Sequence, residues 1–516
     1  MGFSEDQHYD FSKYRPFKPV ARAARRWPDQ VIEKAPIWCS VDLRDGNQAL
    51  VEPMNAAQKL RLWEQLVAIG FKTIEVGFPS ASTHDFDFLR KLIEENRIPD
   101  DVTVQVLVQA RKELIERTFK ALEGAKRAVV HFYNSTSTVQ RRDVFGLDRQ
   151  GIIDIAVAGA ELVKAEAHSY PDTEWIFEYS PESFTGTELD FAVEVCDAVS
   201  AVLAPTPDKP VIINLPATVE MSTPNVYADQ IEWFCDHVKN RESLLISLHT
   251  HNDRGCAVAA AELGVMAGAD RVEGTLMGNG ERTGNMDIVT MAMNLYSQGI
   301  DPELDFQHMD EIISVVRECT QLPVHPRHPY AGELVFTAFS GSHQDAINKC
   351  LARRAENDPW DVAYLPIDPS DIGRTYQEVI RINSQSGKGG VAYVLARDYG
   401  LELPRWLQID FSSSVQKLAE ESESEVAADA IFALFEQTYL QPGSRWSLGD
   451  YQLAREDGVD ALIANLQTPD GETQINGRGN GVVDAFTNAL EALTGKKIVV
   501  VEYSEHTLGQ SADAEA

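Results

Sequence analysis

The stretch LLISLHTHND, residues 244–253, is an apolar run that leads into two histidines. A short apolar run bounded by turn residues is typical of a buried strand in a parallel sheet. His249 and His251 stand two positions apart, so their side chains face the same way on a strand. Two imidazoles on one face can bind a divalent metal, although a packed histidine beside a helix-capping one has the same spacing. We therefore predict a strand that ends in a metal site.

Similar apolar segments alternate with amphipathic helical patterns over the first part of the chain. Residues 56–69, for example, carry leucines and isoleucines at helical spacing. Eight strand and helix units in succession are the signature of an α/β chain folded as a TIM (β/α)8 barrel. A doubly wound sheet is the alternative, but it usually has fewer strands and a nucleotide fingerprint after the first. The expected strands are residues 37–43, 73–77, 103–108, 127–132, 174–179, 210–214, 244–249 and 271–276.

Polar side chains gather at the ends of these expected strands, where barrels place their active sites. Asp45 can offer a carboxylate and Asn285 an amide oxygen to a metal, and the guanidinium of Arg44 suits a carboxylate or an oxyanion. Each has an ordinary structural explanation alone, but six strand ends together predict one site. These residues are Arg44 and Asp45 after the first strand, His131 and Tyr133 at the fourth, Ser180 and Glu182 after the fifth, Asn214 and Thr218 at the sixth, His249 and His251 at the seventh, and Glu281 and Asn285 after the eighth.

The composition of the 516 residues excludes several classes of partner. A net charge of -33 argues against nucleic acid and anionic membranes, since both need a basic face. The six cysteines show no Cys-x-x-Cys spacing, so we expect reduced thiols and a cytoplasmic location. No apolar run is long enough for a signal peptide or a membrane span.

The pattern changes after the barrel. We expect a barrel domain with an N-terminal extension over residues 1–320, a linker subdomain over 321–366, a helical subdomain over 367–425 and a small α+β domain over 426–516. In the last domain, a strand at 461–467, a glycine-rich loop at 476–481, a helix from Val482 and a strand at 497–503 are expected. A glycine-rich loop before a helix can bind a carboxylate or form a plain turn.

Several motifs resemble one enzyme family. LRDGNQ (43–48), HTHND (249–253) and GNGERTGN (278–285) are similar to the signatures of 2-isopropylmalate and homocitrate synthases, a family of metal-dependent TIM-barrel acyltransferases. The resemblance spans nearly the whole chain and is strongest to the longer bacterial 2-isopropylmalate synthases. Further matching motifs are EYSPESF (178–184), NLPAT (214–218), SGSHQD (340–345) and GRTY (373–376).

The resemblance implies that acetyl-CoA condenses with 3-methyl-2-oxobutanoate and that the thioester is hydrolysed, in the first committed step of leucine biosynthesis. It also implies a divalent metal, for which magnesium, manganese and zinc all suit two imidazoles, a carboxylate and an amide oxygen. The implied metal ligands are Asp45, His249, His251 and Asn285, the residues around the keto acid are Arg44, Ser180, Glu182 and Thr218, and the residues that line the pocket are His131, Tyr133 and Asn214.

Family members form homodimers in which a helical subdomain covers the barrel of the partner. His343 and Tyr376 would then act in trans beside Glu281, with His343 as the base that deprotonates acetyl-CoA. The C-terminal domain of relatives binds leucine as a feedback inhibitor, and we expect about one repeat of its unit before Ala516. The alternatives are a homocitrate or citramalate synthase, a lyase on a similar metal barrel, and a non-catalytic leucine sensor.

Overall fold

The structure, a computed structural model, describes residues 12–355, 357–376, 388–401, 403–422, 426, 428–440, 446–500 and 503. The chain divides into two compact units. Met1–Phe336 and Pro366–Thr375 form the first, and Thr337–Leu365 and Tyr376–Ala516 form the second. The finer division into four domains stays a prediction.

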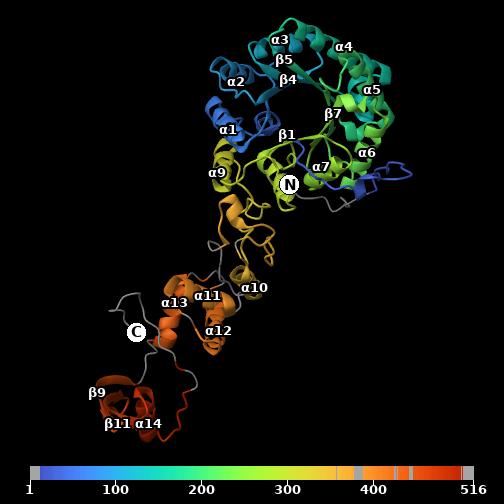
Figure 1. The fold of residues 1–516 in the computed structure, drawn as a ribbon. Helices are drawn as coiled ribbons and strands as arrows, with labels where there is room; N and C mark the ends of the chain where they lie inside the picture. The colour runs from blue at the N-terminus through green and yellow to red at the C-terminus, as the bar shows by residue number, and fades with distance from the viewer. Residues whose placement is uncertain are drawn as a thin grey trace, which may run out of the picture. The chain divides into compact units, whose positions relative to one another are not determined.

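The first unit contains a closed barrel of eight parallel strands in chain order, which Figure 1 shows as a ring. This confirms the predicted TIM barrel and excludes the doubly wound sheet, because a doubly wound sheet is open. The strands are β1 (Ile37–Ser40), β2 (Thr73–Gly77), β3 (Thr103–Gln109), β4 (Arg127–Ser135), β5 (Glu174–Glu182), β6 (Val211–Ala217), β7 (Leu244–Thr250) and β8 (Arg271–Gly274).

Helices surround the barrel, and α1 (Ala56–Ile69) shows how the sequence sets their ends. The Asn55 side chain accepts hydrogen bonds from the backbone of Ala57 and Gln58, which caps the first turn. Gly70 ends the helix with φ of 111°, a conformation that favours glycine. The other helices of this unit are α2 (Thr83–Glu94), α3 (Lys112–Leu122), α4 (Arg149–His168), α5 (Leu189–Leu203), α6 (Pro224–His237), α7 (Ala257–Met266), α8 (Ile288–Tyr296) and α9 (Met309–Thr320).

The prediction that the first strand continues through residues 41–43 is wrong, because a turn of π-helix occupies Asp42–Gly46. The Asp42 carboxylate accepts hydrogen bonds from Ser40 Oγ at 2.8 Å and from the Leu276 backbone N–H at 3.0 Å. These contacts join the end of β1 to the segment after β8. They turn the chain so that Arg44 and Asp45 lie at the mouth of the barrel.

Other boundaries also differ from the expectation, and β6 extends to Ala217, three residues past the predicted end. β4 and β5 run further than predicted, so His131 lies inside its strand and not at the end. β8 stops at Gly274 and is followed by a tight turn over Leu276–Gly278.

Among the described residues, no helix is long and apolar enough to cross a membrane.

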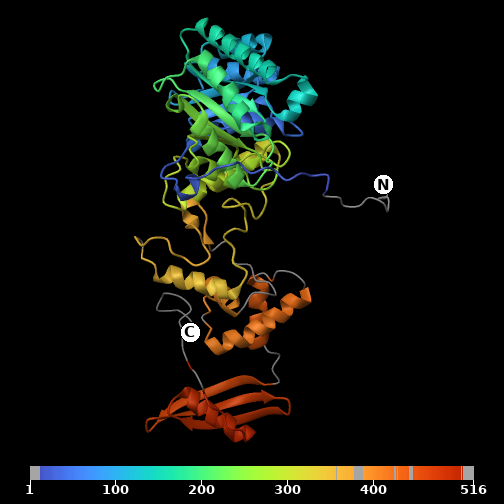
Figure 2. The ribbon, with the colours of Figure 1, turned by 90° about the vertical axis from the view of Figure 1, so that its right-hand side faces the viewer.

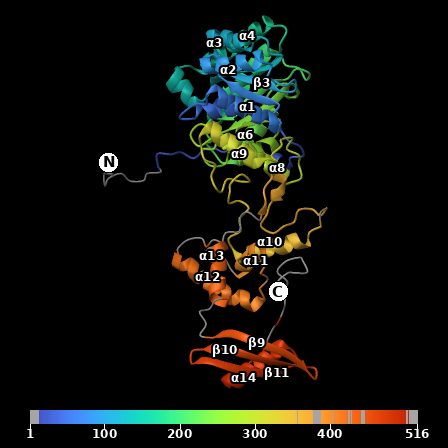
Figure 3. The same cartoon turned by 90° about the vertical axis from the view of Figure 1, so that its left-hand side faces the viewer.

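The second unit has a helical part and a small sheet, which Figures 2 and 3 show from two sides. The helices are α10 (Gly341–Arg353), α11 (Lys388–Tyr399), α12 (Arg405–Ser422) and α13 (Ala428–Phe435). Buried residues of the last three, including Leu395, Phe411 and Ile431, form one apolar cluster. The sheet is antiparallel in the order β11 (Gly471–Gly479), β10 (Val459–Thr468), β9 (Ser447–Glu456).

The helix α14 (Val482–Thr494) packs on this sheet, and the packing explains a wrong prediction. Asn476–Gly479 were expected in a loop, but they belong to β11 and pair with β10. A Cβ atom on Gly477 would lie 2.0 Å from the Ala485 carbonyl oxygen, so this glycine lets the helix approach the strand. The strand expected at 497–503 is absent from the described residues 497–500, and Val501 and Glu502 lie outside the described residues.

Candidate active site

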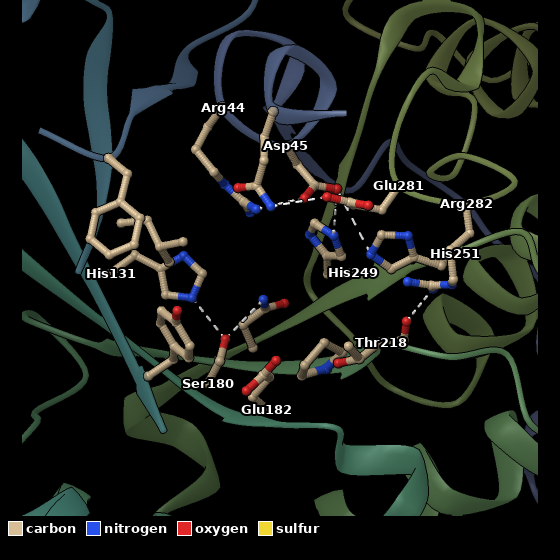
Figure 4. A pocket seen from close by; sticks show the side chains of 16 residues that line it. Arg44, Asp45, His131, Ser180, Glu182, Thr218, His249, His251, Glu281 and Arg282 are labelled. Carbon is tan, nitrogen blue, oxygen red and sulfur yellow. Dashed lines mark hydrogen bonds and ion pairs between the residues drawn. The ribbon is translucent and has the colours of Figure 1, made fainter. Parts of the chain in front are cut away.

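A pocket of about 370 Å³ opens at the carboxyl ends of the barrel strands (Figure 4). It collects side chains from β3 to β7 and from the segments that follow β1, β2 and β8, at the face where barrels place their active sites. The residues that line it are Arg44, Asp45, Gln48, Phe78, Leu107, His131, Tyr133, Ser180, Glu182, Asn214, Pro216, Thr218, His249, His251, Glu281 and Arg282.

One side of the pocket holds a candidate metal centre. Asp45, His249 and His251 each offer a ligand atom, and these atoms lie within 4.8 Å of one another. Asp45 Oδ2 is 3.6 Å from His249 Nε2 and 3.8 Å from His251 Nε2, and Figure 4 shows the two rings side by side below the carboxylate. The two histidines of the HTH motif therefore face the same cavity, as their spacing predicted.

The fourth predicted ligand, Asn285, lies next to this cluster. Its backbone forms a β-bridge with His251, and its side-chain nitrogen donates a hydrogen bond to the Asn279 carbonyl oxygen at 3.0 Å. Its Oδ1 atom is buried without a hydrogen-bond partner, and so is Asp45 Oδ2. Buried oxygens are normally satisfied, so the free acceptor of Asp45 beside two imidazoles fits a divalent cation. Asn285, which bridges His251 through its backbone, offers a second free acceptor.

The three ionisable residues of this centre have pKa values that shift in different directions. Burial alone would raise the pKa of Asp45, but the Arg44 guanidinium and the two imidazoles hold it well below its usual range. Burial would lower the pKa of His249, yet the nearby Asp45 and Glu273 carboxylates raise it to about 9. Burial and the nearby His249 lower the pKa of His251 to about 4. Asp45 is therefore a carboxylate and His251 a neutral imidazole at neutral pH.

Arg44 forms a fixed cation beside the metal centre. Its Nη1 donates a hydrogen bond to Asp45 Oδ1 at 2.8 Å, and its Nε is paired with Glu75. The side chain is only 10% exposed, so these two carboxylates hold the guanidinium in one orientation. The remaining N–H groups can face a bound anion.

The opposite side of the pocket is a hydrogen-bonded polar surface, as Figure 4 shows. His131 Nε2 lies 2.8 Å from Ser180 Oγ, and Asn214 Nδ2 donates to the same oxygen at 3.1 Å. Glu182 is bonded by the Ser135 hydroxyl, and the Thr218 hydroxyl accepts a hydrogen bond from the Ser183 backbone at 3.0 Å. With the Tyr133 hydroxyl, which accepts from Gln109 at 3.1 Å, all residues predicted to contact or line the keto-acid pocket are in one cavity.

Of the predicted catalytic residues, Glu281 lies at the mouth of the pocket, where it accepts a hydrogen bond of 3.1 Å from Gln48. His343 and Tyr376 belong to the second compact unit. His343 lies on α10, and its ring stacks on that of Tyr364 with the ring centres 3.9 Å apart. Tyr376 is buried. The catalytic roles of the two residues stay predictions.

The sequence analysis missed the buried charges beneath the pocket. Glu75 on β2 and Glu273 on β8 are fully buried, and each is hydrogen-bonded to a histidine of the site. Arg271 is equally buried and donates to Glu273 at 2.9 Å. A charged residue inside an apolar strand was the available signal, since such a residue is buried only when it is paired.

Three family models match the chain. Residues 35–316 match the family described as HMGL-like. Residues 333–396 match the domain described as "Alpha-isopropylmalate synthase, post-catalytic domain-like". Residues 425–516 match the "LeuA allosteric (dimerisation) domain". The barrel, the segment after it and the C-terminal sheet are therefore each similar to a part of one enzyme type.

Full-length relatives agree with these matches. The 2-isopropylmalate synthase of Rhodospirillum rubrum is 59% identical over 98% of this chain and 91% of that protein. Those of Ralstonia nicotianae and Alcanivorax borkumensis are each 57% identical over 98% of this chain, and over 88% and 91% of those proteins. These names support the main predicted activity and not the homocitrate or citramalate alternative. The chain belongs to the 2-isopropylmalate synthase family of acyltransferases.

Proposed function

We propose that this chain condenses acetyl-CoA with 3-methyl-2-oxobutanoate and hydrolyses the thioester to give 2-isopropylmalate and CoA. This is the first committed step of leucine biosynthesis. The observation that supports it best is the meeting of Asp45, His249 and His251 beside Arg44, in a chain whose relatives carry that activity in their names.

In this proposal Asp45, His249, His251 and Asn285 bind magnesium, manganese or zinc. Such an ion would polarise the carbonyl of a chelating 2-oxo acid as a Lewis acid. Arg44 stabilises the negative charge that develops on the same oxygen when the acetyl carbanion attacks, because its guanidinium is fixed and buried before the reaction begins. Glu75 and Asp45 keep that cation in place.

The keto acid lies between the metal centre and the polar side of the pocket. Ser180, Glu182 and Thr218 contact it, and His131, Tyr133 and Asn214 line the space around its side chain. The fixed bonds of His131 and Asn214 to Ser180 give this wall one shape. A wall of fixed shape discriminates among 2-oxo acids by the size of their side chains.

Deprotonation of the acetyl methyl group needs a positioned base. We propose that His343 of a second subunit takes the proton at a ring nitrogen, directly or through a water, with Glu281 and Tyr376 beside it. The carbanion then attacks the keto carbon, and the π electrons of the carbonyl move to its oxygen, which takes up the proton. Water adds to the thioester carbonyl, the C–S bond breaks, and CoA leaves as the thiol with one proton of that water. The match of residues 425–516 to a dimerisation domain supports the homodimer that this arrangement needs.

The same match supports leucine as a feedback inhibitor that binds the C-terminal domain. We also propose a cytoplasmic location, which agrees with six free cysteines.

A thiol-release assay with acetyl-CoA tests the proposal. We expect CoA release with 3-methyl-2-oxobutanoate, its loss with a chelator, and its return when magnesium, manganese or zinc is added. Pyruvate and 2-oxoglutarate, the acceptors of citramalate and homocitrate synthases, should give far slower release. Faster release with either of them would replace the proposed substrate, and release that persists in the D45A variant would contradict the metal site.

A further inference from the structure

The two imidazoles of the metal centre have different surroundings. His249 Nδ1 lies 2.8 Å from Glu273 Oε2, whereas His251 Nδ1 is buried without a hydrogen-bond partner. Both residues are about 5% exposed. Of the two rings, only that of His249 is therefore held by a hydrogen bond at its Nδ1 atom.

Glu273 is itself held firmly. It is fully buried on β8, directly opposite His249 of β7 in the strand register. Its Oε2 also accepts from Asn214 at 3.2 Å, and its Oε1 accepts from Arg271 at 2.9 Å and Gln105 at 3.0 Å. Hydrogen bonds from four side chains therefore hold the Glu273 carboxylate in one position against the His249 ring.

A carboxylate with four donors can only accept, so the proton on this side of the imidazole must reside on His249 Nδ1. A ligating imidazole is neutral, so an ion that binds here displaces the proton of Nε2, the nitrogen that faces Asp45 Oδ2 at 3.6 Å. Carboxylates that bind the far nitrogen of a metal-ligating histidine in this way fix its tautomer and its ring orientation.

We propose that Glu273 is the positioning residue of the metal centre, which sets the orientation of His249 before an ion binds. This inference rests on the metal site of the proposed function. His251 is then the ligand whose ring can change its orientation, because no side chain fixes its Nδ1. Glu273 is not among the proposed ligands, and its effect on ion binding passes through His249.

Glu178 provides a matched control. It is a second fully buried carboxylate, on β5, 3.4 Å from the same Arg271. Neither of its oxygens has a hydrogen-bond partner, and Oε1 lies 3.6 Å from His131 Nδ1. Replacing Glu178 with Gln therefore changes a second buried carboxyl group beside Arg271 without touching His249.

The test measures Co²⁺ binding to the full-length metal-free protein by calorimetry and by the visible spectrum of bound Co²⁺. We expect Glu273→Gln to weaken Co²⁺ affinity about 10- to 100-fold and to change the spectrum. Glu178→Gln should change neither. Circular dichroism and thermal unfolding in chelator establish that each variant is folded. If Glu273→Gln fails to fold, Glu273→Asp replaces it, because the shorter side chain keeps a charge near Arg271 while it withdraws from His249.

A double variant separates positioning from general damage. In a His249→Ala background, Glu273→Gln should weaken Co²⁺ binding no further, since its effect passes through that ring. Equal affinity of the folded Glu273 variant and the wild type, or an equal loss in Glu178→Gln, overturns this inference and leaves the proposed function standing. Absence of saturable Co²⁺ binding in the wild type overturns both.

Discussion

Asp45 Oδ2 lies 3.6 Å from His249 Nε2, so a carboxylate that follows β1 faces an imidazole at the end of β7 across the mouth of the barrel. The two strands are not neighbours, because β8 lies between them. The side chains meet only because the sheet closes. The free Oδ2 atom makes this carboxylate the most sensitive position of the metal centre.

Asp45→Asn tests that position. The variant keeps the size of the side chain but loses the charge, and its amide group beside the imidazoles binds a cation poorly. We expect Co²⁺ affinity and thiol release both to fall about 100-fold or more, because a ligand is lost and not merely reoriented. Equilibrium dialysis and the thiol assay check this, and an unchanged dissociation constant would contradict the ligand role.

Arg44→Lys tests the fixed cation. Lysine keeps the charge but not the planar fork that binds Asp45 and Glu75 together. We expect kcat to fall about 10²- to 10³-fold, the usual loss when one donor to a developing oxyanion is removed. Co²⁺ affinity should change much less. A variant that loses metal and activity in the same proportion would show that Arg44 acts only by holding Asp45.

Asp42→Asn tests the buried carboxyl that joins β1 to the segment after β8. Burial raises the pKa of Asp42 from 3.8 to about 7 in the folded chain. A raised pKa means that the neutral carboxyl contributes its full stability below pH 3.8, and that this contribution is lost as the pH rises through 7. The loss amounts to roughly 4 kcal/mol above pH 7, from about three pKa units.

The amide of Asp42→Asn can still accept from Leu276 and donate to Ser40, but it does not ionise. We therefore expect the thermal midpoint of the variant, relative to the wild type, to rise between pH 4 and pH 8. Unfolding curves in chelator at each pH measure this difference. A difference that is constant with pH would mean that Asp42 does not titrate in this range.

Gly477→Ala tests the packing of α14 on its sheet. The added Cβ atom would lie 2.0 Å from a backbone oxygen of the helix, so the helix must move, at a cost of about 1–3 kcal/mol. Gly481→Ala is the control, since its Cβ atom meets nothing within 4 Å. We expect faster hydrogen exchange in β10 and β11 of the first variant only, with Co²⁺ affinity unchanged in both. Equal exchange in the two variants would show that the sheet tolerates the displacement.

Local pattern in the sequence was enough to predict the barrel. Alternation of apolar runs and helical periodicity depends on neighbouring residues, and it located all eight strands. It also placed the polar residues at the carboxyl ends, so the HTH pair at 249–251 and the acidic residue Asp45 were found without coordinates. The ends of β1 and β4 differ from the predicted ones, because contacts with distant residues, such as the hydrogen bonds of Asp42, override local preference.

The glycines of Asn476–Gly479 predict a loop, but these residues form the end of β11. Pairing with β10 and the close approach of α14 decide its conformation, and both are contacts with distant residues. Glycine permits a turn and a close packing contact equally.

The sequence by itself determined which residues could serve a metal-dependent barrel enzyme, since residue type and spacing fix the available ligands. Only the tertiary structure decided which buried charges support them. Glu273 is distant in sequence from Gln105 and Asn214, and a glutamate within a strand reads equally as an outward polar residue. Closure of the barrel brings their side chains to one buried carboxylate, and a buried charge is stable only when it is paired.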